Sequence, residues 1–141
     1  SMWCAYVVMP RSDAINREYI GFIDLSTYHQ WVGGVTSGPK FRSSGYDGTE
    51  HPAVALANFS AGTAYCIINI FNASNVSLYI NGTLQQSVAA GTPSIASDVF
   101  TVGKQFHPAE ADVCEVVAAS GVPSAGDIAS ITTYLTTKWG L

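Results

Sequence analysis

The chain has 141 residues, of which 48% are hydrophobic and only 11% are charged, and its formal net charge is -4. This length and this hydrophobicity suit one folded domain with a buried core, which excludes an intrinsically disordered chain. The six basic residues form no cluster that could neutralise a row of phosphates, and the apolar runs are too short to cross a bilayer, so neither nucleic acid nor membrane insertion is expected.

We expect one domain over residues 2–141. Ser1 is set aside because a Ser-Met start is typical of tag cleavage, and the domain is compatible with a piece cut from a longer protein. The first half alternates short apolar runs with turn signals, which predicts strands over residues 3–9, 19–25, 30–35 and 40–42. Gly33 and Gly34, inside the third strand, indicate a bulge or a close approach of the backbone.

Residues 46–51 are predicted to form an exposed turn, because Asp47 and Gly48 continue a stretch that is rich in turn signals. Strands over 53–57 and 63–71 follow. Aromatic rings stack on sugars, and polar side chains beside them bind hydroxyls, so this stretch and the strand before it supply the candidate ligand-binding residues. They are Trp31, Tyr46, Asp47, Glu50 and His51. For Trp31 a place in the core is the alternative interpretation.

The second half predicts strands over 75–80, 83–88, 98–102 and 112–119. Asn81 and Gly82 tolerate the positive φ angles of a type I′ turn, which indicates a tight hairpin between the first two. A helix is expected over 125–138. It begins with a capping pattern of Ser124 and Asp127, continues with apolar residues at three- and four-residue spacing, and stops at Gly140.

The three cysteines, Cys4, Cys66 and Cys114, are far apart and form no CxxC pair. This spacing indicates neither a zinc site nor a redox motif. An odd number leaves at least one thiol free or paired between chains. We expect buried free thiols that act as small apolar side chains.

Three segments resemble the C-terminal half of laminin-G-like, concanavalin A-like jelly-roll domains. They are residues 75–84 (NVSLYINGTL), 111–117 (ADVCEVV) and 121–141 (GVPSAGDIASITTYLTTKWGL), whereas the first half agrees only in its strand pattern. Some bacterial and phage members end in a helix of the type YLxxKWG. The resemblance implies an all-β, two-sheet antiparallel jelly-roll sandwich with one short C-terminal helix.

The resemblance also implies a non-catalytic recognition module, a glycan- or receptor-binding domain of a phage virion or a bacterial surface protein. Its partner would be a carbohydrate or a cell-surface receptor, and its place would be the virion or the cell exterior. The alternative is a purely structural or oligomerising virion domain. Phage fibres are commonly trimers, so a homotrimer formed through the parent protein is compatible with either, although no heptad repeat encodes it.

Glu110, Asp112 and Glu115 form an E-x-D-x-x-E pattern that resembles the motif of family 16 glucanases. A small glycoside hydrolase would need a bulge to bring these carboxylates together and an open cleft lined by several tryptophans, of which the chain has three in all. We therefore expect no catalysis.

Some laminin-G-like domains bind calcium through aspartates, and Asp47 or Asp98 would be the candidates here. No D-x-D-x-D loop is present. The sequence assigns neither a metal site nor another cofactor.

Overall fold

The computed structural model describes residues 1–12, 18–23, 30–36, 38–72, 74–91, 99–103 and 110–141. The first half of this part of the chain contains the strands β1 (Met2–Pro10), β2 (Glu18–Ile23), β3 (Gln30–Val35), β4 (Phe41–Tyr46) and β5 (Glu50–Val54). The second half contains β6 (Tyr65–Phe71), β7 (Asn75–Ile80), β8 (Thr83–Ala89), β9 (Val99–Val102), β10 (Ala111–Ser120) and the helix α1 (Ala125–Trp139).

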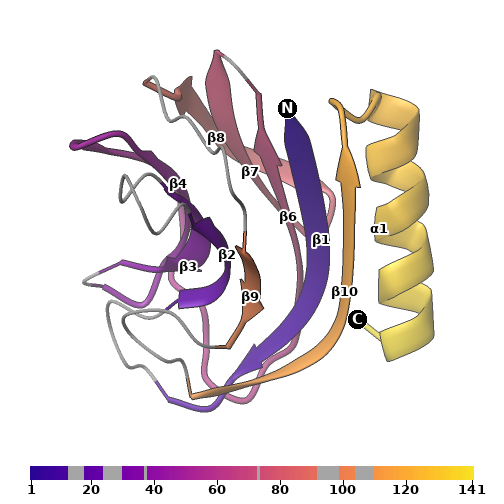
Figure 1. The fold of residues 1–141 in the computed structure, drawn as a ribbon. Coiled ribbons are helices and arrows are strands. Elements are labelled where there is room, and N and C mark those ends of the chain that lie inside the picture. The colour runs from indigo at the N-terminus through magenta and orange to yellow at the C-terminus, as the bar shows by residue number, and fades with distance from the viewer. Residues whose placement is uncertain (13–17, 24–29, 37, 73, 92–98, 104–109) are drawn as a thin grey trace.

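The strands form two sheets that pack face to face, with α1 outside them (Figure 1). Sheet A has the order β10-β1-β6-β7-β8, and sheet B has the order β5-β4-β3-β2-β9. All paired neighbours are antiparallel. On one side of the sandwich the two edge strands, β5 and β8, contact each other. The expected antiparallel jelly-roll sandwich with one C-terminal helix is confirmed.

The central strands of sheet A, β1 and β6, are buried on both faces. In β1, Tyr6 and Val8 belong to the core between the sheets, whereas Ala5 and Val7 belong to a second cluster beneath α1. A strand covered on both sides has no need of polar residues at alternate positions. This explains why both strands are almost entirely apolar in sequence, with Asn69 as the polar exception in β6.

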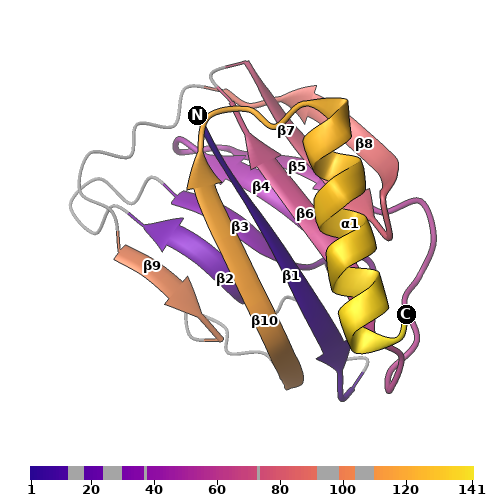
Figure 2. The ribbon, with the colours of Figure 1, turned by 90° about the vertical axis from the view of Figure 1, so that its right-hand side faces the viewer.

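Helix α1 is capped at both ends as the sequence predicts. The Ser124 hydroxyl accepts a hydrogen bond from Asp127 N at 3.2 Å, and the Asp127 carboxylate accepts one from Ser124 N at 2.9 Å. Gly140 ends the helix in the left-handed region, with φ 68°. The helix lies on the outer face of sheet A (Figure 2), where Leu135 is fully buried. No helix in the described part of the chain is long and apolar enough to cross a bilayer.

The predicted close approach at β3 is confirmed at Gly33. A Cβ atom there would collide with the Asn69 side-chain amide and lie 2.8 Å from the Tyr6 hydroxyl oxygen. Asn69 is fully buried, and its Nδ2 donates to the Tyr6 hydroxyl at 3.3 Å. A glycine is needed because this polar pair of sheet A presses directly on the backbone of sheet B.

The predicted tight hairpin between β7 and β8 is also confirmed. Asn81 and Gly82 have φ angles of 48° and 79°, as a type I′ turn requires. The turn is tied to β6, because Asn81 Oδ1 accepts a hydrogen bond from Cys66 N at 2.9 Å.

The predicted boundaries of β4 and β5 were wrong. The strand expected over 40–42 extends to Tyr46, and the strand expected over 53–57 begins at Glu50. Ser43, Ser44 and Gly45 look like a turn in the sequence, yet they lie in β4, where both serines are buried. These small residues fit in β4 because the strand is paired with β3 on one side and with β5 on the other, which leaves little room for larger side chains.

Two of the three cysteines behave as expected and one does not. Cys4 and Cys66 are buried free thiols, and burial raises their pKa values to about 12 and about 11. Both therefore stay protonated and unreactive at neutral pH. Cys114, in contrast, is a free thiol exposed on β10, so the prediction that it is buried was wrong.

Candidate functional site

The β4–β5 hairpin brings four of the five predicted ligand-binding residues together. Its tip, defined here as residues 46–51, joins Tyr46 to Glu50 in register. The Asp47 carboxylate accepts a hydrogen bond from Thr49 N at 3.2 Å, and Gly48 adopts a φ of 104° that favours glycine. These features make the tip a tight turn on a paired base rather than a loose loop.

One face of the hairpin carries Tyr46, Glu50 and Arg42. Residues paired across an antiparallel ladder share a face, and Arg42 shares it because it precedes Tyr46 by four residues in the same strand. The Arg42 guanidinium forms an ion pair with the Glu50 carboxylate. The Arg42 side chain is only 13% exposed, whereas that of Glu50 is 42% exposed. An aromatic ring, a carboxylate and a guanidinium thus share one face of sheet B.

Asp47 and His51 form a support under the tip. His51 Nε2 lies 3.1 Å from Asp47 Oδ1, and because an ionised carboxylate only accepts, the ring nitrogen is the donor. Gly91, which follows β8, packs against both: a Cβ atom there would lie 2.5 Å from Asp47 Oδ2 and 2.6 Å from His51 Cδ2. The tip therefore rests on the backbone of the segment that follows β8.

Trp31, the fifth predicted residue, does not lie at a binding surface. It is 7% exposed and stacks on Phe71, with ring centroids 4.9 Å apart and an interplanar angle of 6°. Its register partner Gly45 has no side chain, which leaves room for the indole between the sheets. The assignment of Trp31 to the ligand site is corrected, and the alternative of a core residue holds.

Arg42 and Gly91 were missed by the sequence reasoning. Arg42 and Tyr46 are four positions apart in one strand and therefore share a face. The sequence did not show this because the strand was expected to end at Arg42. Gly91 follows a strand of the other sheet and lies 40 or more positions from the tip, so only the folded chain brings it there.

The bulge that the glucanase pattern requires is present, but it does not assemble a catalytic pair. The β1–β10 register shifts from Val7 opposite Glu115 to Val8 opposite Val113, which leaves Cys114 as the extra residue. Asp112 forms an ion pair with Arg11, and Glu110 is exposed where the strand begins.

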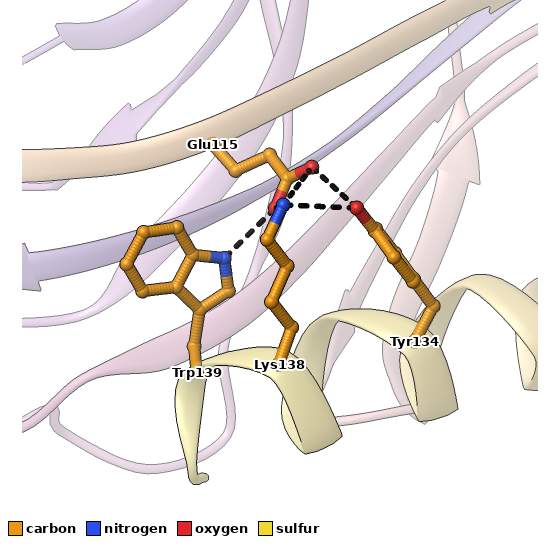
Figure 3. Close-up of polar contacts among 4 residues, drawn as sticks. All are labelled: Glu115, Tyr134, Lys138 and Trp139. Carbon is orange, nitrogen blue, oxygen red and sulfur yellow. Dashed lines mark hydrogen bonds and ion pairs between the residues drawn. The ribbon is translucent and has the colours of Figure 1, made fainter.

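Glu115 is bound by the C-terminal helix (Figure 3). Its carboxylate accepts hydrogen bonds from Trp139 Nε1 at 2.9 Å and from the Tyr134 hydroxyl at 2.9 Å, and Lys138 Nζ lies 3.1 Å away. The bonds from Trp139, then Lys138 and Tyr134, lower the pKa of Glu115, which favours the ionised form. A general acid needs the opposite shift, so this carboxylate serves as an anchor for α1.

The described residues offer little to a calcium ion. Calcium takes six to eight oxygen ligands. The partners of Asp47 include Thr49 N and the His51 ring. The described part of the chain contains no group of three or more His, Cys, Asp or Glu side chains that could hold a metal. Asp98 lies outside the described residues. The described residues therefore neither confirm nor contradict calcium binding, which the resemblance alone suggests.

An apolar pocket of about 240 Å³ lies on the other side of the sandwich, between β2 and β10. It is lined by Ser1, Met2, Phe22, Ala118, Ala119 and Ser120. The tip contributes no residue to it, and no lining residue carries a charged side chain. Its polar side chains are Ser1 and Ser120 alone, so the lining is mostly apolar and suits a glycan less well than the hairpin does.

Neither a protein-family model nor a curated protein sequence matches this chain. Solved structures do match. They include the heptameric SAP-like pentraxin from Limulus polyphemus, with a TM-score of 0.75, 9% identity, and coverage of 93% of this chain and 69% of the pentraxin. The fold is a concanavalin A-like jelly roll.

Two further matches support this concanavalin A-like assignment. Domains LG4-5 of mouse laminin α1 have a TM-score of 0.67 at 8% identity, over 89% of this chain and 37% of theirs. The CBM40 of the Ruminococcus gnavus IT-sialidase, bound to α2,3-sialyllactose, has a TM-score of 0.66 at 10% identity, over 93% of this chain and 82% of its own. This chain thus matches most of the length of the CBM40 structure and 37% of the laminin structure. Identities this low establish the fold alone.

Proposed function

We propose that this domain is a non-catalytic recognition module that binds a carbohydrate, as a free glycan or as part of a cell-surface receptor, at the β4–β5 hairpin. The observation that carries the proposal is the shared face of Tyr46, Glu50 and Arg42 on a hairpin that Asp47 and His51 hold against sheet A. Each of these groups has a role that glycan binding requires.

The chemistry of the three side chains suits a polyhydroxylated ligand. A tyrosine ring offers an apolar face to the C–H side of a sugar, and its hydroxyl is a hydrogen-bond donor and acceptor. The Glu50 carboxylate accepts from sugar hydroxyls, and the Arg42 guanidinium donates to hydroxyl or carboxylate oxygens. The paired strands hold these groups before the ligand arrives, which reduces the entropy lost on binding.

The comparisons support this proposal through similarity of fold, whereas its main support is the chemistry of the hairpin residues. The CBM40 match was solved with sialyllactose bound. The YLTTKWG helix of this chain resembles the ends of phage and bacterial members, so we place the domain on a virion or a bacterial surface.

A hydrolase is disfavoured by the position of the three acidic residues. A retaining or inverting mechanism needs two carboxyl groups that face each other across a glycan cleft. Glu115 is bound by α1, and Asp112 is paired with Arg11. We therefore propose a domain without catalytic activity.

A second candidate is a structural or oligomerising virion domain. It is favoured by the apolar pocket between β2 and β10. Beside this pocket the Phe100 ring packs at a tilt against Phe22, with ring centroids 4.7 Å apart, and remains 38% exposed. An apolar edge of this kind is typical of contacts between chains. A concentration-dependent rise in mass by light scattering would favour this candidate.

A glycan array tests the leading proposal. The wild type, Tyr46→Ala and Glu50→Gln are compared, each with and without calcium. Tyr134→Ala is the matched control, because Tyr134 is an exposed tyrosine on α1, away from the hairpin. We expect binding that both hairpin variants lose and the control retains. If the wild type binds no glycan with or without calcium, the result would count against the proposal.

A further inference from the structure

We propose that Gln86, assisted by Gln85, is a positioning residue: its side-chain amide holds β5 in place and thereby sets the β4–β5 hairpin. The inference rests on the proposed function for its effect on ligand binding. Its structural part stands on contacts between the two sheets.

A bulge in β8 aims two consecutive glutamines at β5. The β7–β8 register shifts from Leu78 opposite Gln86 to Tyr79 opposite Leu84, so Gln85 is the extra residue. In a regular strand neighbouring side chains point to opposite faces, whereas a bulge lets two in succession reach the same partner. Gln86 Oε1 accepts a hydrogen bond from Val54 N at 2.7 Å, and Gln85 Oε1 accepts one from Leu56 N at 3.3 Å.

These bonds cover the outer edge of the chain at the end of β5, which is an edge strand of sheet B, and at Leu56 just beyond it. Ala55 N donates inward to Phe41 O at 2.8 Å, so the amides of Val54 and Leu56, on either side, face outward. The next outward position, Pro52, has no N–H to donate. From residue 52 to residue 56 the two glutamines therefore take the place of a neighbouring strand.

The residues that follow β8 support the tip of the β4–β5 hairpin. After β8, Ala90 N donates to Ser74 O at 2.9 Å, and Gly91 then packs against Asp47 and His51. The segment 85–91 thus touches β5 near its end, through Gln86, and the hairpin tip, through Gly91. We infer that these two contacts, one from β8 and one from the residues that follow it, together set the position of β5 and with it the positions of Tyr46 and Glu50.

The proposal predicts that the acceptor oxygen of residue 86, rather than its size, sets the hairpin. Gln86→Glu keeps the acceptor, and Gln86→Leu removes it at similar volume. Ser87→Ala is the matched control, since Ser87 hydrogen-bonds Ser77 within sheet A and does not reach β5. Gln85→Leu is a second probe, because it removes only the bond to Leu56.

The test combines residue-resolved amide hydrogen exchange with the nuclear Overhauser contact between His51 and Gly91. Loss of one hydrogen bond raises local opening by roughly five- to tenfold. We expect Gln86→Leu to raise exchange at Val54 by this factor and to weaken the His51–Gly91 contact. Gln86→Glu and Ser87→Ala should change neither. Gln85→Leu should raise exchange at Leu56 while leaving Val54 protected, a pattern that general destabilisation cannot produce.

Binding is then measured for the variants against a glycan that the wild type binds on the array. Weaker binding by Gln86→Leu with rescue by Gln86→Glu supports the positioning role. Unchanged exchange and an unchanged His51–Gly91 contact in Gln86→Leu would overturn the inference, whatever the array shows. Altered exchange with unaltered affinity would overturn the positioning role and leave the binding site intact. A wild type that binds no glycan would refute the proposed function, and exchange would still decide the contact between the sheets.

Discussion

Replacing Gly33 by alanine should weaken the fold at the point where the sheets come closest. The added methyl group would collide with the Asn69 amide and lie 2.8 Å from the Tyr6 hydroxyl oxygen, below the 3.0 Å that real Cβ atoms keep. Overpacking a tight core costs about 1–3 kcal/mol, and displacing Asn69 breaks its bond to Tyr6, which contributes about 1 kcal/mol. We therefore expect a loss of about 2–4 kcal/mol in the free energy of unfolding.

Urea and thermal denaturation measure this loss. For a chain of this size the expected decrease in Tm is roughly 6–12 °C. Gly38→Ala is the matched control, because nothing lies within 4 Å of a Cβ atom at Gly38. In an Asn69→Ala background the cost of Gly33→Ala should decrease, since the main obstacle is gone. Equal stabilities of the Gly33→Ala and Gly38→Ala proteins would refute the reasoning.

Three further changes probe α1. Leu135→Ala should lower the free energy of unfolding by about 2–5 kcal/mol in chemical denaturation, because this side chain of α1 is fully buried against sheet A. Ser124→Ala should cost about 1 kcal/mol by the same assay, through loss of the N-cap. Hydrogen bonds from Trp139, Lys138 and Tyr134 lower the pKa of Glu115 below its ordinary 4.5. The ionised carboxylate therefore stabilises the fold above pH 4.5. This stabilisation is lost as the pH falls through the pKa that Glu115 has in the folded protein. Glu115→Gln should therefore lower the Tm at neutral pH and change it less as the pH falls through the lowered pKa of Glu115; a decrease of the same size at every pH would contradict this.

The elements with local signals could be predicted from the sequence. The type I′ turn at Asn81 and Gly82 and the capping box at Ser124 depend on a few neighbouring residues, and the structure confirms both. The glycines of β3 also gave a correct indication, although which atoms they would meet was not readable. Such features depend on backbone geometry over a handful of positions.

Features that depend on the meeting of two sheets were not predictable. The face of Trp31 depends on Gly45 and Phe71, and the extension of β4 through Ser43 and Ser44 depends on pairing with two other strands. The contacts of Gln85 and Gln86 with the end of β5 depend on a bulge in β8, and the sequence around this bulge contains no turn residue that would have indicated it. The sequence therefore named four residues that the fold brings together on one hairpin, while the contacts that support this hairpin appeared only in the folded chain.

The measurement that tests the central claim most directly is a two-dimensional NMR titration of the labelled domain with an oligosaccharide that binds on the array. The account predicts that the largest amide shifts fall on the hairpin tip, residues 46–51, and at Arg42, while β10 and α1 stay unperturbed. Shifts concentrated instead around Phe22 and Ala118, or around Glu115 and Trp139, would place the ligand elsewhere and contradict the account.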